Sequence, residues 1–168
     1  MTILQARLAT KLASGGGIFR NRQGELEDGK TNGTDMFLGC IITQLTESNA
    51  IDLDPCAYTE IPDGVICEIK GGTVLNDNDA EGLIANNINV KFGKLHPGDK
   101  VLVCAGVNRT CTKGYLAILD DTYPGFVQQM APSNESVDDL PPFRIVGKFL
   151  EAVTAVAEQA CYVYIEVL

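Results

Sequence analysis

Phe143-Arg-Ile-Val-Gly-Lys-Phe-Leu-Glu151 and Ala160-Cys-Tyr-Val-Tyr-Ile-Glu-Val-Leu168 are the two stretches that decide the fold class. Both are dense in β-branched and aromatic residues, which suit a pleated, half-buried strand. Gly147 interrupts the first stretch, and a missing side chain inside a strand indicates a bulge or a close backbone approach. Because apolar residues occupy both faces, we expect this pair of strands to close a barrel or to contact a sister subunit.

Further strands are indicated by apolar runs that are bounded by turn residues. They cover residues 36–45, 64–71, 83–92, 101–104 and 110–119. Pro97 and Gly98 give the clearest turn, since proline sets φ at one central position and glycine accepts the positive φ of the next. Seventeen glycines, seven prolines and no tryptophan also favour many turns and short elements. The sequence predicts an all-β fold, an antiparallel β-barrel or a jelly-roll-like sandwich with an extended N-terminal arm.

Residues 1–34 are expected to form that arm, and residues 35–168 the β-domain, with a long Pro-rich loop at 120–142. Apolar residues at 3–12 are spaced as in a short helix, and Gly15, Gly16 and Gly17 end it. A frayed terminus is the alternative to a reaching arm. We favour the arm, because its apolar residues would otherwise be exposed. The candidate contact residues in it are Ile3, Leu4, Leu8, Ile18, Phe19, Arg20 and Arg22.

Two aromatic residues in the long loop, Tyr123 and Phe126, flank Pro124-Gly125. Loops rarely carry two aromatic side chains unless these cover another surface, so both are candidate contacts with a partner or a second subunit.

The composition narrows the classes of partner. A net charge of -9 over 168 residues argues against binding nucleic-acid phosphates. The sequence shows no signal peptide and no run of membrane-spanning length, so we expect neither a membrane partner nor secretion. Synthesis and assembly in a cytoplasm is the interpretation that fits these features.

Six cysteines occur without CxxC spacing: Cys40, Cys56, Cys67, Cys104, Cys111 and Cys161. Four of them lie in apolar strand patterns, where a reduced cysteine acts as a small hydrophobic residue. We expect buried free thiols, with a Cys104–Cys111 disulfide and a metal site as open alternatives. His96 could pair with Cys104 or Cys111 as a nucleophile, although a surface turn histidine is the simpler interpretation.

Oxygen ligands gather in Asn76-Asp-Asn-Asp-Ala-Glu81, where Asp77, Asp79 and Glu81 could hold Ca²⁺. The run lacks the glycine and glutamate of an EF-hand loop, so an ordinary acidic turn is the preferred interpretation. Neither a Gly-x-Ser-x-Gly elbow nor a phosphate-binding loop occurs. We therefore assign no catalytic residues, no metal and no cofactor, and predict that the protein is not an enzyme.

One resemblance adds to this interpretation. Arg144-Ile-Val-Gly-Lys-Phe-Leu-Glu151, a spacer and Tyr162-Val-Tyr-Ile-Glu-Val-Leu168 resemble the closing segment of small β-rich capsid decoration (cement) proteins of tailed bacteriophages. In that group a strand of the form Val-Gly-x-Ala/Leu-x-Glu/Ala, a loop of small residues and a final apolar strand often end the chain. Leu95-x-Pro-Gly-Asp-x-Val-x-Val103 is similar to the segment that precedes it. The arm and the Pro-rich loop lie outside the similarity.

The resemblance implies a β-barrel or sandwich on the outside of a capsid, commonly as a homotrimer at three-fold positions. Its partners would be the major capsid protein and further copies of itself, and it would brace the shell as part of the virion. Many modest contacts then add up where no single contact is strong. Two alternatives remain: a phage tail or baseplate structural protein, and a small β-barrel hydrolase with cysteine or carboxylate chemistry.

Overall fold

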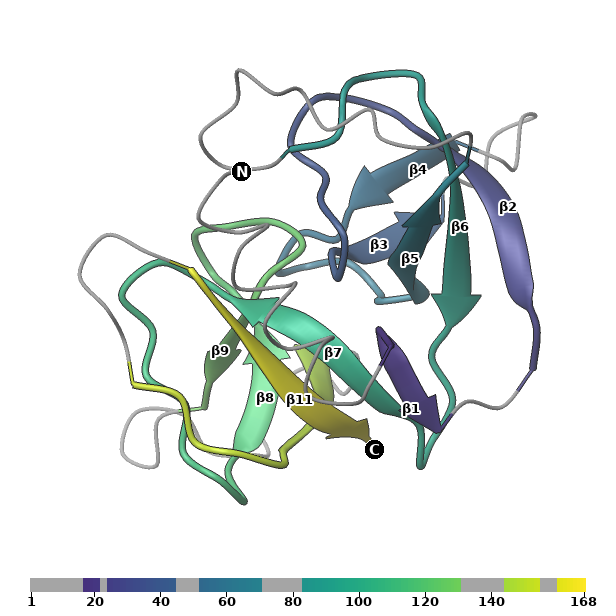
Figure 1. Ribbon diagram of the computed structural model, residues 1–168. Coiled ribbons are helices and arrows are strands. Elements are labelled where there is room, and N and C mark those ends of the chain that lie inside the picture. Colours follow the sequence, from purple (N-terminus) through teal and green to yellow (C-terminus); the bar gives the residue numbers. More distant parts are fainter. Residues whose placement is uncertain (1–16, 22–23, 45–51, 71–82, 131–143, 155–159) are drawn as a thin grey trace.

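A computed structural model describes residues 17–21, 24–44, 52–70, 83–130, 144–154 and 160–168. Eleven β-strands lie in these segments, with no α-helix among them, and ten of the strands form two closed barrels (Figure 1). Nowhere in this described part is there a helix with the length and apolarity needed to cross a membrane. The all-β barrel fold expected from the sequence is therefore confirmed.

The first barrel comprises β2 (Leu26–Thr31), β3 (Ile41–Gln44), β4 (Asp52–Pro55), β5 (Gly64–Ile69) and β6 (Asn89–Lys94). Its strands follow one another in the order β2-β4-β3-β5-β6, and antiparallel pairing of β2 with β6 closes the ring. The contact between β2 and β4 is parallel, whereas all its other pairings are antiparallel.

The second barrel comprises β7 (Lys100–Ala105), β8 (Leu116–Leu119), β9 (Val127–Gln129), β10 (Ile145–Phe149) and β11 (Cys161–Val167). Its order is β7-β11-β10-β8-β9, and a parallel bridge between Ala105 and Val127 joins β9 back to β7. A short strand, β1 (Phe19–Asn21), pairs with the remaining edge of β7 and lies between the barrels (Figure 1).

The two barrels repeat one circuit of strands. If β2 to β6 are matched in chain order with β7 to β11, every pairing of the first barrel has a counterpart of the same direction in the second. The register of the parallel pair agrees as well. Asn32 N donates to Leu53 O in the first barrel, and Gly106 N donates to Val127 O at the equivalent place in the second. The chain is thus a tandem of two barrels with one topology.

A glycine turn precedes the second strand of each circuit. Cys40 N donates to Phe37 O, and Tyr115 N donates to Thr112 O, which closes two turns of equal length. Gly39 and Gly114 occupy the same place in these turns, with φ values of 86° and 90° that favour glycine. We call residues 37–40 and 112–115 the first and second glycine turns.

A second pair of glycines fixes how closely the last two strands of each circuit approach. Gly64 faces Lys94, and Gly147 faces Val167. A Cβ at Gly64 would lie 2.6 Å from the oxygen of Gly93, and one at Gly147 would clash with the oxygen of Glu166. The expected close approach at Gly147 is therefore confirmed, and so is the expected irregularity, since the β8–β10 register shifts between Ile145 and Gly147.

One continuous apolar core runs through both barrels. It includes Leu53, Phe92, Val103 and Ile165, all with at most 1% of their surface exposed. A core that crosses the junction indicates that the two barrels fold as one body.

The structure also corrects several expectations from the sequence. The folded body consists of two barrels, and β1 and β2, which lie within the range expected to form the arm, belong to that body. The strand expected at 36–45 begins only at Ile41, after the first glycine turn, and β4 and β9 form within segments expected to be loops. The C-terminal hairpin is confirmed, since β10 and β11 pair antiparallel.

Candidate functional site

The junction between the barrels is built from the first glycine turn and the outer face of β7 and β11. Gly39 packs against the ring of Tyr162 and the carbonyl of Leu102; a Cβ there would lie 3.0 Å from the Tyr162 ring. The Tyr162 hydroxyl donates to Leu38 O at 2.6 Å. Burial raises the pKa of Tyr162 well above its usual value, so the hydroxyl stays protonated and keeps donating this hydrogen bond.

Phe126 lies at the same junction. Its ring stacks on Phe37 with 4.4 Å between centroids, and Tyr123 meets Phe126 edge-on at 6.1 Å. Gly125 beside it exchanges backbone hydrogen bonds with barrel 1, accepting from Ile41 N at 3.0 Å and donating to Cys56 O at 2.8 Å. The half-buried Phe126 therefore contacts the other barrel of its own chain, whereas Tyr123 keeps 38% of its surface exposed.

Residues 17–20 enter the body at this junction. Ile18 is buried, and its carbonyl accepts from Leu102 N at 2.6 Å. Phe19 covers Gly93 of β6, where a Cβ would lie 2.6 Å from the phenyl ring. Arg20 places its guanidinium 3.7 Å from the centre of the Tyr164 ring, and the Tyr164 hydroxyl donates to Gly17 O at 3.0 Å.

The structure thus separates the predicted contact residues into three groups. Ile18, Phe19 and Phe126 pack within the molecule, while Arg20 and Tyr123 remain on the surface. The rest of the arm set, Ile3, Leu4, Leu8 and Arg22, lies outside the described residues.

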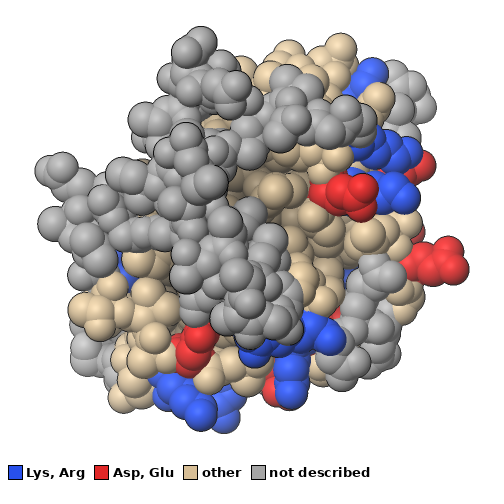
Figure 2. Space-filling view, viewed as in Figure 1, with Lys and Arg blue, Asp and Glu red and all other residues tan. Residues whose placement is uncertain are grey.

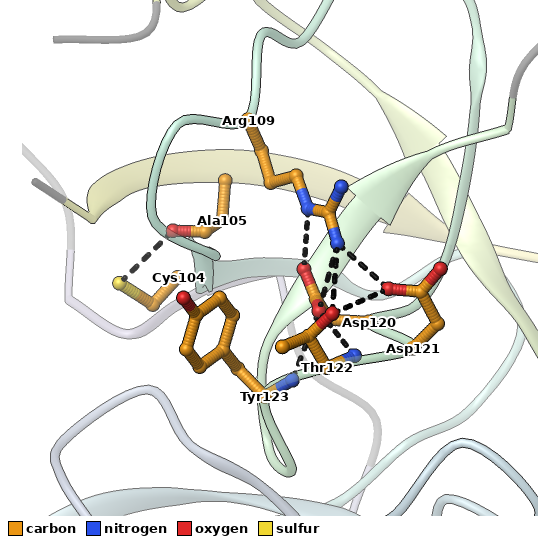
Figure 3. A network of polar contacts seen from close by, with 7 residues as sticks. All are labelled: Cys104, Ala105, Arg109, Asp120, Asp121, Thr122 and Tyr123. Carbon is orange, nitrogen blue, oxygen red and sulfur yellow. Dashed lines mark hydrogen bonds and ion pairs between the residues drawn. The ribbon is translucent and has the colours of Figure 1, made fainter. Parts of the chain in front are cut away.

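A polar network holds the loop that carries Tyr123 (Figure 3). Asp120 is buried, and its carboxylate accepts from Arg109 Nε at 2.9 Å and from the amides of Thr122 and Tyr123 at 2.8 and 3.0 Å. The same guanidinium reaches Asp121 at 2.7 Å. Three hydrogen bonds from Arg109 and two within the turn fix the backbone from which Tyr123 projects.

The hydrogen bonds and charges of this network shift the pKa values of Arg109 and Asp121. The hydrogen bond to Asp120 raises the pKa of Arg109. The Thr122 hydroxyl, and after it the Arg109 charge, lowers the pKa of Asp121. Arg109 and Asp121 are therefore both charged at neutral pH, which strengthens the ion pair between them.

Next to this turn lies an acidic hollow of about 340 Å³. Its lining residues come from both barrels and are Asn32, Gly33, Asp35, Asp54, Pro55, Ala57, Glu60 and Pro124. Burial raises the pKa of Asp54, and Glu60 and Asp52 act in the same direction, while a hydrogen bond from Asn32 opposes them. Tyr123, Pro124 and the acidic hollow together form an exposed surface, which we call the loop surface.

None of the six cysteines forms a disulfide bond. All six are free thiols, five of them buried, so the expectation of buried free thiols is confirmed, and the Cys104–Cys111 disulfide does not form. Burial raises the pKa of Cys56 and of Cys111 to about 12, and it also raises that of Cys40. A protonated thiol is a poor nucleophile at neutral pH.

His96 belongs to the connection between the barrels. Its amide donates to Asp99 Oδ2 at 3.1 Å, and its ring Nδ1 lies 3.5 Å from the same oxygen. Pro97-Gly98 forms the expected turn there, with Gly98 at a φ of 90°. The histidine is thus the turn residue that the sequence indicates.

Metal ligands do not converge in the described segments, which contain no cluster of three or more histidine, cysteine or acidic side chains able to hold an ion. The expected acidic turn at Asp77, Asp79 and Glu81 lies outside those segments.

Sequence reasoning missed Arg109 and Asp120 as the residues that hold the Tyr123 loop. Asp120-Asp-Thr122 after an apolar strand was a usable signal, since an aspartate at that position often accepts amides two and three residues further on. Arg109 lies eleven positions away, and only the fold brings it to Asp120.

Comparison with known proteins gives no family for this chain: no family model matches it, and neither does any curated protein.

Proposed function

We propose that the protein is a structural virion component that binds the outside of a phage capsid and stabilises contacts between major capsid proteins. The observation that supports this most is where the segments of the resemblance lie. The Pro-Gly-Asp segment leads into β7, and the closing segments form β10 and β11. These three strands are neighbours in the order β7-β11-β10, so the similar segments make one continuous sheet.

The loop surface is the part of the described body that we assign to the capsid. Tyr123 supplies an exposed aromatic side chain on a backbone held by the Asp120 network, and aromatic anchors on rigid supports dominate binding energies. The adjacent carboxylates Asp35, Asp54 and Glu60 favour a basic segment of the partner. We further propose that residues 1–16 add contacts as an arm and that three copies act together at a three-fold position.

The test is sedimentation of the full-length protein with empty shells of the cognate major capsid protein. We expect the protein to sediment with the shells and to saturate at a multiple of three copies per three-fold position. Shells that leave it in the supernatant would contradict the proposal. Labelling of the tail instead of the head in intact particles would support the tail alternative.

A matched pair of variants locates the contact. Tyr123→Ala and Tyr115→Ala each remove one exposed tyrosine, with 38% and 42% of its surface accessible. We expect Tyr123→Ala to weaken shell binding about tenfold, and Tyr115→Ala to leave it unchanged. Equal effects of the two variants would remove the loop surface from the proposal. Deletion of residues 1–16, which spares β1 and β2, tests the arm separately.

A further inference from the structure

The tandem repeat gives each surface at the junction a counterpart elsewhere on the molecule. Barrel 1 contributes the first glycine turn, and barrel 2 contributes a face made by Leu102, Tyr162 and Tyr164. The junction is heterologous, because the two barrels contribute different surfaces to it: a turn from one and a strand face from the other. Barrel 2 therefore retains an unused turn, and barrel 1 an unused face.

Strand register identifies these counterparts. Thr31 and Ala105 are equivalent, because each is the residue that bridges in parallel to the third strand of its circuit, at Leu53 or Val127. Counting back three residues matches Asp28 with Leu102. Asp28 pairs with Lys91 on β6, and Leu102 pairs with Tyr164 on β11, so Lys91 is equivalent to Tyr164. Two residues earlier on these strands, Asn89 is equivalent to Tyr162. The unused face is thus Asp28, Asn89 and Lys91, and the unused turn is the second glycine turn.

The unused surfaces keep the backbone geometry of the junction. Gly39 and Gly114 share a positive φ, and each donates its amide to a carbonyl on the fourth strand of its circuit, at Ile66 or Phe149. The pairing of β2 with β6 reproduces that of β7 with β11 over the residues that form the face. A second copy of the chain could therefore dock by the same backbone arrangement, head to tail.

The side chains, in contrast, have changed from apolar to polar. Phe37 and Leu38 correspond to Thr112 and Lys113, both exposed. On the face, charged Asp28 and Lys91 stand where Leu102 and Tyr164 are buried. The Asp28 side chain is 64% exposed and binds Lys70 at 2.6 Å. Figure 2 shows acidic and basic side chains interspersed over β2 and β6.

Docking a second copy onto this face would remove water from Asp28 and Lys91. Removing water from a charged group is unfavourable unless a well-placed partner of opposite charge compensates it. The two barrels also differ at the free edge of their first strand. In the second barrel β1 covers the edge of β7 beside Leu102. In the first barrel no described strand covers the equivalent edge of β2 beside Asp28. Charged side chains on such an edge also hinder pairing with another strand.

We propose that the Asp28–Asn89–Lys91 face and the second glycine turn are a matched pair of docking surfaces that polar side chains hold closed to a second copy. Without this closure, a heterologous contact would add copies head to tail into rings or filaments. Terminal repeats of tandem proteins are capped by polar outer faces in the same way. This inference is independent of capsid binding.

The test restores the junction side chains on two separate full-length proteins. A face variant carries Asp28→Leu, Asn89→Tyr and Lys91→Tyr, and a turn variant carries Thr112→Phe and Lys113→Leu. Mixed one to one, they should form a complex in sedimentation velocity with a dissociation constant in the micromolar range. Each variant mixed with the wild-type chain should associate at least tenfold more weakly, because one polar surface remains.

Circular dichroism and thermal melts first establish that both variants fold. Folded variants that fail to associate when mixed would overturn the claim of matched geometry. Whether these two surfaces are unused in the wild-type protein is tested by two single substitutions, Asp28→Lys and Lys113→Glu. Each should leave the sedimentation coefficient of the wild-type protein unchanged. If either single change dissociates a wild-type oligomer, the surfaces are working contacts, and the inference fails even where shell binding persists.

Discussion

At the scale of single residues, Gly147 shows how a missing side chain sets a strand contact. A Cβ there would clash with the carbonyl oxygen of Glu166, a backbone atom held by the pairing of β10 with β11. We expect Gly147→Ala to lower the free energy of unfolding by about 2–3 kcal/mol, because the strands must separate to admit the methyl group. Urea denaturation measures this loss.

Gly33→Ala is the matched control for Gly147→Ala. Gly33 has a φ of 109°, and a methyl group on its Cα would meet no other atom within 4 Å, so only backbone strain of about 1 kcal/mol opposes alanine there. Losses of the same size at both positions would show that the close approach to Glu166 is not what requires glycine.

Asp63 makes a second residue-scale prediction, which concerns pH. Its Oδ2 is buried without a hydrogen-bond partner among the described residues, and burial raises the pKa of the carboxyl. Lys94 opposes this shift and Glu27 adds to it. Above the ordinary value of 3.8, the folded protein holds this proton more tightly than the unfolded chain, so ionisation lowers stability as pH rises.

Asp63→Asn, which cannot ionise, should therefore be more stable than the wild type at pH 7, by about 1 kcal/mol. The advantage should shrink as pH falls towards 3.8, where the wild-type carboxyl becomes neutral in both states. Thermal melts of both proteins between those two pH values check this. An advantage that stays constant, or grows on acidification, contradicts it.

At the scale of elements, the sequence revealed the strands whose own residues prefer a pleated, buried surface. β11 and β7 are rich in valine, isoleucine and tyrosine, and both were predicted, as was the turn at Pro97-Gly98. β2 and β4 were missed. Leu26–Thr31 has one apolar side chain, and half of Asp52–Pro55 is charged, so neither segment shows an apolar strand pattern. Their extended form comes from pairing, of β2 with the distant β6 and of β4 with β2 and with its neighbour β3.

The repeat was equally hidden. Equivalent positions share glycines, at 39 and 114 and at 64 and 147, but little else, because the turns and close approaches require glycine while barrel interiors accept many apolar residues. For the same reason the sequence marked Tyr123 and Phe126 as candidate contacts but could not show that Phe126 packs on Phe37 of its own chain. Aromatic content is visible in sequence, whereas the position of Phe37 depends on the whole fold.

At the scale of the whole molecule, contacts from several elements tie the barrels together. Tyr162 bonds to Leu38, Phe126 stacks on Phe37, and the Arg144 guanidinium lies 2.9 Å from the centre of the Tyr58 ring. β1 adds a strand to barrel 2 while Phe19 covers barrel 1. Because the apolar core is continuous across these contacts, neither barrel can lose its structure without exposing apolar surface of the other.

We therefore predict that the two barrels unfold in a single cooperative transition, with calorimetric and van't Hoff enthalpies that agree. Tyr162→Phe removes the 2.6 Å hydrogen bond to Leu38 and leaves a half-buried carbonyl without this donor, which should cost about 1–2 kcal/mol. Hydrogen exchange at Val90 and Val163, which occupy equivalent positions in the two barrels, should accelerate together in this variant. Two calorimetric transitions, or faster exchange at Val163 alone, would show instead that the junction joins two independently stable barrels.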